Sequence, residues 1–239
     1  MLSAQIQLTD QDARSISSAR GSAKIGQTAS TADGRKYAYA HAGGSTLAAG
    51  KINISAPLVA NHINTTAPVT AVGSTQVSVT VGATAVTADQ YAGGYLAVDV
   101  DPGNNVYLIV GNTACGSAGT TVVTLAEPLT VALTGTSRIS LYPNQFESII
   151  VSSSAVAFQA AGVANVSLTA ANYGWVQVGG YCSVLSDGAI TKNAGAIISD
   201  AVAGAVEIEV AGTVTKRVGY APELTVDTAY RPVVLEIKV

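Results

Sequence analysis

The sequence predicts an all-β protein: two small antiparallel β-sandwich or barrel lobes preceded by an extended N-terminal arm. Many short segments alternate apolar and polar residues with a period of two, which is typical of strands with one buried face. Val and Thr, whose branched side chains favour a pleated sheet, are abundant. Turn signals recur at roughly 8–12 residues, as in sandwiches and barrels. A β-solenoid stays open as an alternative, although no fixed repeat length is present.

The arm is expected at residues 1–36, the first lobe at 37–145 and the second at 146–239. Between Ser15 and Gly34 the chain is rich in Ser, Ala, Gly and Thr and has no apolar period, which indicates an extended arm or a linker. Thr9 and Asp12 have the spacing of a cap for one short helix. The arm carries five of the twelve cations of the chain, which are Arg14, Arg20, Lys24, Arg35 and Lys36.

The first lobe begins with alternation from Tyr37 and is expected to contain a hairpin. Asp101-Pro102-Gly103-Asn104-Asn105 is a strong turn signal, so Tyr95–Val100 and Val106–Val110 should pair as antiparallel strands. The other strands expected here are Leu47–Ile54, Gln76–Val81, Thr120–Leu125, Leu129–Leu133 and Arg138–Leu141.

Tyr142-Pro143-Asn144 marks the boundary between the lobes, and the same pattern of strands then resumes. In the last expected strand, Val233 to Val239, odd-numbered apolar residues face inward and Glu236 and Lys238 face outward. The preceding strands are expected at Ile149–Ser152, Ala155–Phe158, Val163–Leu168, Gly174–Val178, Cys182–Leu185, Val206–Val210 and Thr213–Val218.

Composition limits the classes of function. No Lys or Arg occurs between Lys51 and Arg138, so this region is a poor place for a phosphate, nucleotide or nucleic-acid site. No run of about 18 apolar residues is present, which argues against a transmembrane helix. Charged residues are 11% of the chain, against about 25% in a typical soluble protein. Such a neutral surface predicts subunits that assemble.

Residue types that carry chemistry are few, and we expect no enzyme, no cofactor and no metal. His41 and His62 lack a recognisable catalytic setting, so we interpret both as loop or interface residues. Cys115 and Cys182 have no metal-ligand spacing and are expected to be buried free thiols. Asp99, Asp101, Asn104 and Asn105 could supply oxygen ligands to calcium, but the same residues suit a hairpin turn. Lys216-Arg217 is interpreted as a solvated strand end or an intersubunit ion pair.

Contact residues are therefore sought among exposed cations and aromatics. Trp175, the sole Trp, is either part of the core or an interface anchor. The interface candidates are Arg14, Arg20, Lys24, Arg35, Tyr37, Tyr39, Tyr91, Tyr95, Trp175 and Tyr230.

Four blocks together resemble a structural protein of tailed bacteriophages. The blocks are Gly34-Arg35-Lys36-Tyr37 with Gly43-Gly44, Thr87 to Leu96, Tyr173-Gly174-Trp175-Val176-Gln177, and Ala229-Tyr230-Arg231-Pro232-Val233. None of them is a catalytic motif.

This resemblance implies a capsid decoration (cement) protein on the outer surface of the virion. Such a protein would bind the major capsid protein after shell expansion and clamp neighbouring capsomers. By the same analogy it would be a homotrimer whose N-terminal arms reach neighbouring subunits. Two alternatives stay open: another virion part, such as a head fibre base, tail or capsid component, and a carbohydrate-binding adhesin. The sugar site of an adhesin could be built from Tyr91, Tyr95, Asp99 and Tyr107.

Overall fold

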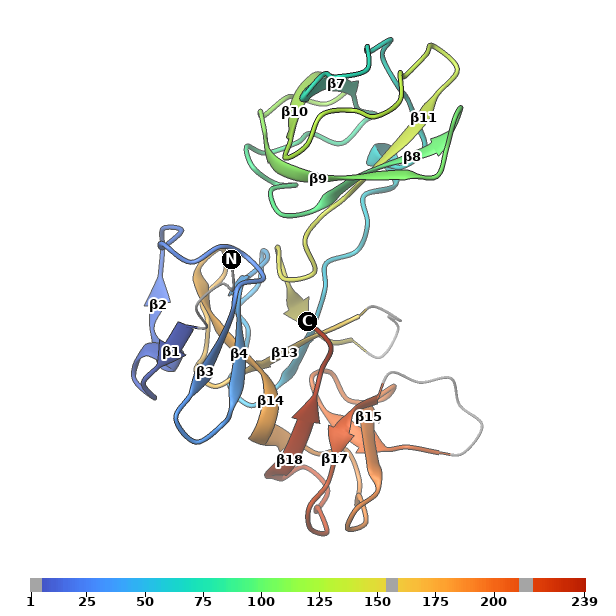
Figure 1. Ribbon diagram of the computed structural model, residues 1–239. Helices are drawn as coiled ribbons and strands as arrows, with labels where there is room; N and C mark the ends of the chain where they lie inside the picture. Colours follow the sequence, from blue (N-terminus) through green and yellow to red (C-terminus); the bar gives the residue numbers. More distant parts are fainter. Residues whose placement is uncertain (1–5, 154–158, 211–216) are drawn as a thin grey trace. The chain divides into compact units, whose positions relative to one another are not determined.

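The computed structural model describes residues 6–153, 159–210 and 217–239 (Figure 1). In these ranges the regular structure consists of strands and two 3₁₀ turns, which confirms the prediction of an all-β protein. The chain divides into two compact units. Unit 1 comprises residues 1–56 and 145–239, and unit 2 comprises residues 57–144.

The division expected from the sequence needs a correction, because residues 37–56 belong with the C-terminal part of the chain. The strand β5 (Ile52–Ile54) pairs antiparallel with β12 (Ile150–Val151) and with β13 (Ala160–Ala164). These ladders join segments that lie far apart in the sequence. Unit 2 is therefore an insertion within unit 1, between Ala56 and Gln145.

The described part of the N-terminal segment is not an extended arm but an edge of the unit 1 sheet. The strand β1 (Ile6–Leu8) pairs parallel with β3 (Thr28–Thr31), and β3 pairs antiparallel with β4 (Lys36–His41). The short strand β2 (Ile16–Ser17) pairs with Tyr173 and Gly174. The segment also buries three apolar side chains, which are Ala13, Ile25 and Ala29.

The expected helix cap is present as a single turn. Thr9 Oγ1 accepts a hydrogen bond from the Asp12 backbone N–H at 3.1 Å, and Asp12 Oδ2 accepts one from the Thr9 N–H at 3.0 Å. The 3₁₀ helix η1 (Asp12–Arg14) follows.

One long strand, β14 (Tyr173–Leu185), organises unit 1 and replaces two strands expected separately. Its first half pairs with β4, whereas residues 179–185 pair with β18 (Tyr230–Glu236). Gly180 has a φ of +79°, a conformation open to glycine, and lies where β14 changes partner. Figure 1 shows β14 running from the blue strands β3 and β4 to the red strands β17 and β18. The sheet then continues through β17 (Arg217–Tyr220), β15 (Gly195–Ile198) and β16 (Val206–Ile208).

Two apolar clusters form the core of unit 1. One surrounds the first half of β14, where Trp175 contacts Tyr39 edge to face with the ring centroids 5.1 Å apart. The other surrounds the second half and includes Cys182 and Val184. The strand β14 thus carries residues of both clusters.

Unit 2 is a six-stranded antiparallel sheet that is nearly closed into a barrel, because its edge strands β6 and β7 contact each other. The 3₁₀ turn η2 (Ala60–His62) precedes the sheet. In sheet order the strands are β6 (Thr65–Thr66), β11 (Arg138–Tyr142), β8 (Tyr95–Val100), β9 (Asn105–Asn112), β10 (Thr120–Leu125) and β7 (Gln76–Thr80). The expected hairpin is confirmed as β8 and β9, with Tyr95 opposite Leu108 and Ala97 opposite Val106.

Several expected strands are shorter than predicted, and the one expected at Leu129–Leu133 is not formed. Leu133 makes only an isolated bridge with Thr70, and Leu47 makes one with Leu168. The strand β18 stops at Glu236, so Ile237 is only partly buried and Val239 is 61% exposed rather than inward. The expected strand at residues 155–158, and residues 213–216 of another, lie outside the described residues.

Candidate functional site

Four of the predicted interface residues are buried within their own unit and therefore do not face a partner. Tyr37, Tyr39 and Trp175 pack in the first cluster of unit 1, and Tyr91 packs in the core of unit 2. Trp175 was interpreted as either a core residue or an interface anchor. It is 8% exposed, so it is a core residue. The period-two pattern predicts which residues of these strands share a face. It does not predict whether that face is covered by neighbouring strands.

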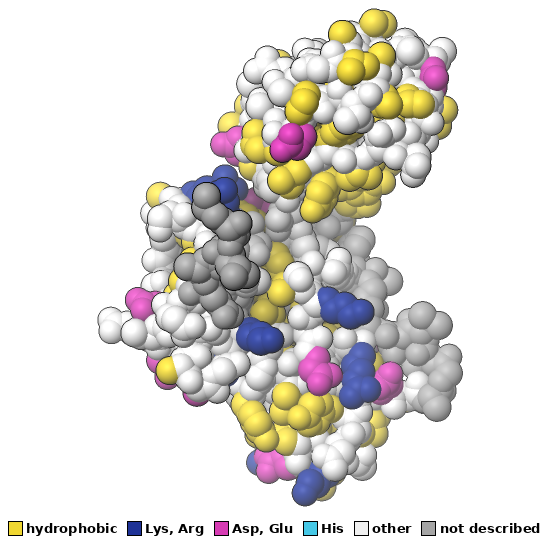
Figure 2. All heavy atoms as spheres, in the orientation of Figure 1, with side chains coloured by type: hydrophobic (Ala, Val, Ile, Leu, Met, Phe, Trp, Pro, Cys, Tyr) yellow, Lys and Arg dark blue, Asp and Glu magenta, His cyan; other side chains and the backbone are white. Residues whose placement is uncertain are grey.

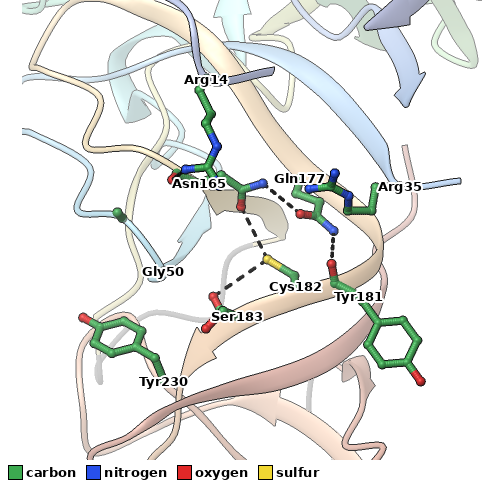
Figure 3. Close-up of a pocket in the computed structure, with 10 residues that line it drawn as sticks. Arg14, Arg35, Gly50, Asn165, Gln177, Tyr181, Cys182, Ser183 and Tyr230 are labelled. Carbon is green, nitrogen blue, oxygen red and sulfur yellow. Dashed lines mark hydrogen bonds between the residues drawn. The ribbon is translucent and has the colours of Figure 1, made fainter. Parts of the chain in front are cut away.

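The other candidates lie at the surface, and three of them come together. Arg14, Arg35 and Tyr230 line one pocket in unit 1, with a volume of about 500 Å³ (Figure 3). Tyr95 lies on unit 2, whereas Lys24 and Arg20 are exposed elsewhere on unit 1, with Arg20 3.9 Å from Glu147. The further lining residues, which sequence reasoning missed, are Ala49, Gly50, Asn165, Gln177, Tyr181, Cys182 and Ser183.

The strand β14 builds the floor of this pocket. Gln177 is buried and its amide donates to the carbonyls of Gly179 and Tyr181, at 3.1 and 2.8 Å. Its Oε1 accepts a hydrogen bond of 2.9 Å from Asn165, whose Nδ2 also donates to the Tyr37 hydroxyl. Cys182 Sγ donates to Asn165 Oδ1 at 3.5 Å, and burial raises the pKa of this thiol to about 12. The floor is therefore a connected polar network that fixes its own side chains.

The two guanidinium groups of the pocket differ in whether a carboxylate balances their positive charge. Arg35 forms ion pairs with Asp33, at 2.7 Å, and with Asp10. A hydrogen bond from Thr31 and then the Arg35 guanidinium hold the pKa of Asp33 below its ordinary value. Arg14 instead donates to the Asn165 carbonyl at 3.1 Å and forms no ion pair among the described residues. The pocket therefore contains one cation without a paired carboxylate.

The aromatic wall is set by Gly50. This glycine has a φ of +72°, and a Cβ at its position would lie 2.5 Å from a ring carbon of Tyr230. The Tyr230 ring therefore packs directly against the Gly50 backbone, while Tyr230 as a whole remains 50% exposed. Only a residue without a side chain permits this placement.

A second candidate surface lies on unit 2 and consists of outward apolar residues of the central hairpin. Along β9, Tyr107 and Ile109 face the core, whereas Val106, Leu108 and Val110 face outward and are 63%, 43% and 54% exposed. Tyr95, opposite Leu108, is 49% exposed. We call Tyr95, Val106, Leu108 and Val110 the β8–β9 face. A strand at the surface of an antiparallel sheet ordinarily carries polar residues at these positions.

Unit 2 combines this face with few charges. Its residues include one cation, Arg138, and the four acids Asp89, Asp99, Asp101 and Glu127. Figure 2 shows yellow apolar side chains scattered among the white atoms that make up most of the visible surface of this unit, with few charged side chains. An exposed apolar strip of this kind marks interaction surfaces more often than isolated apolar residues do.

The sugar site expected on unit 2 needs a correction. Tyr91 and Tyr107 are 1% and 6% exposed, because both point into the barrel. Tyr91 instead hydrogen-bonds His62 Nδ1 at 2.5 Å, and burial raises the pKa of its hydroxyl. The cluster of exposed aromatics that an adhesin would need is therefore not assembled there.

The two histidines make structural contacts. His62 is fully buried and its Nε2 contacts the Thr84 carbonyl at 2.9 Å, so it is a core residue rather than the expected loop or interface residue. His41 pairs with Glu147 and stacks on Tyr173 with the ring centroids 4.4 Å apart.

The two carboxylates considered for calcium accept hydrogen bonds from hydroxyl groups. Asp99 accepts a hydrogen bond of 2.5 Å from Ser140, and Asp101 accepts from Thr136 and Thr134. These two bonds hold the pKa of Asp101 below its ordinary value. Within residues 6–153, 159–210 and 217–239, no three His, Cys, Asp or Glu side chains gather as metal ligands would.

The remaining predictions concern thiols and the dibasic pair. Both cysteines are free, but Cys115 is partly exposed rather than buried. Arg217 lies 3.8 Å from Glu209 of the same chain, and Lys216 is outside the described residues. The described chain has no helix with the length and apolar character needed to span a membrane.

Comparison with family models, with curated proteins and with solved structures finds no match for this chain.

Proposed function

We propose that this chain is a capsid decoration protein that binds the outer surface of a bacteriophage shell and bridges neighbouring subunits of the major capsid protein. The observation that carries the proposal is the β8–β9 face, a strip of outward apolar residues on a sheet that already has a complete core. The sequence resemblance to tailed-phage structural proteins supports the choice of partner. The alternative of another virion component would use the same face against a different partner.

Burial of this face would give useful binding free energy. Complete burial of a Val or Leu side chain stabilises by about 1.5–3 kcal/mol, so covering the exposed halves of these residues contributes about 1 kcal/mol each. The neutral surface around them has few charges to desolvate on binding. Repeated over many copies on a shell, contacts of this size reinforce it without any chemical step.

The charges of unit 2 also indicate the kind of patch that it would contact. With four carboxylates and one guanidinium, this unit favours a neutral or basic patch on the capsid protein. Trimerisation of the chain, which the resemblance implies, stays a prediction that sedimentation equilibrium of the purified protein checks.

The test uses expanded capsids that lack the protein, with bound copies counted after sedimentation. The variant V106K/V110K places two ammonium groups in the β8–β9 face, and we expect its affinity to fall at least about 30-fold because these charges would be desolvated. The control V69K/V72K makes the same change at two valines outside β8 and β9 that are 80% and 61% exposed. It should bind within about threefold of the unmodified protein, as expected for surface changes.

Two results would overturn the proposal at different levels. Equal binding by both variants would reject the β8–β9 face as the docking surface. A protein that never associates with capsids would reject the decoration function itself.

A further inference from the structure

We propose that the unit 1 pocket binds an acidic saccharide, meaning a sugar ring that carries a carboxylate. This activity would be separate from capsid binding, because the pocket is built wholly from residues of unit 1. A decoration protein with such a site would also attach the particle to acidic glycans.

The charge of the pocket favours a ligand with a single negative group. The ten lining residues include two arginines and no Asp or Glu. The Arg35 charge is already balanced by Asp10 and Asp33, which leaves Arg14 to attract an anion. A guanidinium pairs with a carboxylate through two parallel hydrogen bonds, and Arg14 commits only Nη1 to the Asn165 carbonyl.

The same charges disfavour a phosphate or a nucleotide. A phosphate monoester carries nearly two negative charges and would approach the carboxylates that flank Arg35. No helix N-terminus or glycine-rich phosphate loop is among the lining residues. One carboxylate therefore matches the pocket better than a polyanion.

The walls suit a ring with hydroxyl groups and an apolar C–H face. The Tyr230 ring is half exposed and held against Gly50, so it offers a fixed flat surface on which a sugar can stack. The hydroxyls of Ser183 and Tyr230 can each donate and accept hydrogen bonds. In Figure 3 Arg14 and Ser183 lie beside the Asn165–Gln177 network, whereas the Tyr181 ring points away from it.

The size and rigidity of the pocket are consistent with this ligand. A volume of about 500 Å³ lies within the range of about 300–1,000 Å³ for small-molecule sites. The amide N–H groups of Gln177 and Asn165 are all engaged within the floor, so the floor does not have to rearrange when a ligand binds.

The experiment is a binding screen of the full chain against immobilised oligosaccharides that end in galacturonate, glucuronate or N-acetylneuraminate. Each is presented beside its methyl ester, which has the same shape without the charge. We expect at least one acid to bind at least about tenfold more tightly than its ester, because the ester cannot form a charged pair with Arg14. Calorimetry with that oligosaccharide then measures the variants.

Two variants and a control separate the roles of the residues. Arg14→Gln should abolish the preference for acid over ester, and Tyr230→Ala should weaken both ligands at least about fivefold through loss of stacking. Arg231→Gln is the control, because Arg231 is a partly exposed arginine of the same unit that does not line the pocket, and its Nη1 instead lies 3.8 Å from Glu223 Oε1. It should bind like the unmodified protein.

The proposal would be overturned by a lack of binding to any of the acids, by equal binding of acids and esters, or by an unchanged preference in Arg14→Gln. Inorganic phosphate that competes as well as the sugar acid would also overturn it, since the pocket would then be a general anion site. Both pocket variants should still bind capsids, so this proposal and the decoration function fail in different assays.

Discussion

Unit 1 and unit 2 are both antiparallel β structures, yet they place their polar groups in opposite ways. Unit 1 buries a polar network under an open pocket and contains eleven of the twelve cations of the chain. Unit 2 has one apolar core and a second row of apolar residues that faces outward. The same alternating strand pattern thus encloses a polar network in unit 1 and presents a row of apolar residues outward in unit 2.

The connectivity of the two units differs as well. Unit 2 is one continuous segment, whereas unit 1 is assembled from two segments that unit 2 separates. Its ladders between β4 and β14 and between β5 and β13 join these two segments. Closing such long-range contacts costs chain entropy that the local hairpins of unit 2 avoid.

The largest effect is expected from truncating one core leucine in each unit. Leu141→Ala in unit 2 and Leu47→Ala in unit 1 should each lower the free energy of unfolding of their own unit by about 2–5 kcal/mol, because both leucines are fully buried. Trp175 is the sole Trp and lies in unit 1, so its fluorescence in a urea titration follows that unit alone. Leu47→Ala should shift this transition and Leu141→Ala should not. Equal shifts would mean that the two units unfold together.

A smaller effect is expected from adding a methyl group where backbone strands approach closely. A Cβ on Gly94 of unit 2 would clash with the Tyr142 carbonyl, and one on Gly219 of unit 1 would clash with the Val234 carbonyl. We expect Gly94→Ala and Gly219→Ala to destabilise by about 1–3 kcal/mol, since backbone cannot move aside as a side chain can. Calorimetric melting of each variant measures this loss.

The matched controls for these glycines are Gly116→Ala in unit 2 and Gly44→Ala in unit 1. A Cβ at either position meets no atom within 4 Å. Both controls should stay within about 0.5 kcal/mol of the unmodified protein. If a control loses as much stability as its partner, steric contact is not the cause.

The smallest effect concerns the rates at which the two thiols react. Each unit contains one of them, so the two units are compared without any substitution. Cys182 of unit 1 is buried and its pKa is raised to about 12, so at pH 8 only about one molecule in ten thousand carries the thiolate. Cys115 of unit 2 is partly exposed. Iodoacetamide should therefore modify Cys115 at least about tenfold faster, as peptide mass spectrometry would measure. Equal rates would show that unit 1 opens locally around β14.

The elements that the sequence predicted well are those defined by local signals. The hairpin of β8 and β9 has a strong turn sequence between two alternating runs. The strand β8 has the expected bounds, and β9 extends beyond the expected Val106–Val110 at both ends. The short cap of Thr9 and Asp12 is equally local. The small polar residues before Gly34 have no period, which led to the prediction of an arm outside the sheet. Instead β3 pairs with β1 and with β4, because backbone hydrogen bonds do not depend on such a period.

The candidate sites show the same limit. Alternation along β9 gives two faces, but only the barrel closure decides that Tyr107 is inside and Leu108 outside. The pocket was not predicted because Gly50 and Asn165 are unremarkable in their own sequence neighbourhoods, and the block that ends at Gln177 gives no sign of which residues surround it. Arg14, Arg35 and Tyr230 were identified individually as surface residues, without any indication that they meet.

By itself, the sequence determined the all-β class, the position of the central hairpin and the scarcity of cations in unit 2, because each depends on composition or on a pattern a few residues long. Only the tertiary structure decided that the N-terminal segment is an edge of the unit 1 sheet, that unit 2 is an insertion, and that Arg14 lies beside β14. The physical reason is that strands pair through backbone N–H and C=O groups, which are the same in every non-proline residue. Side-chain patterns therefore specify which segments become strands more strongly than they specify which strands become neighbours.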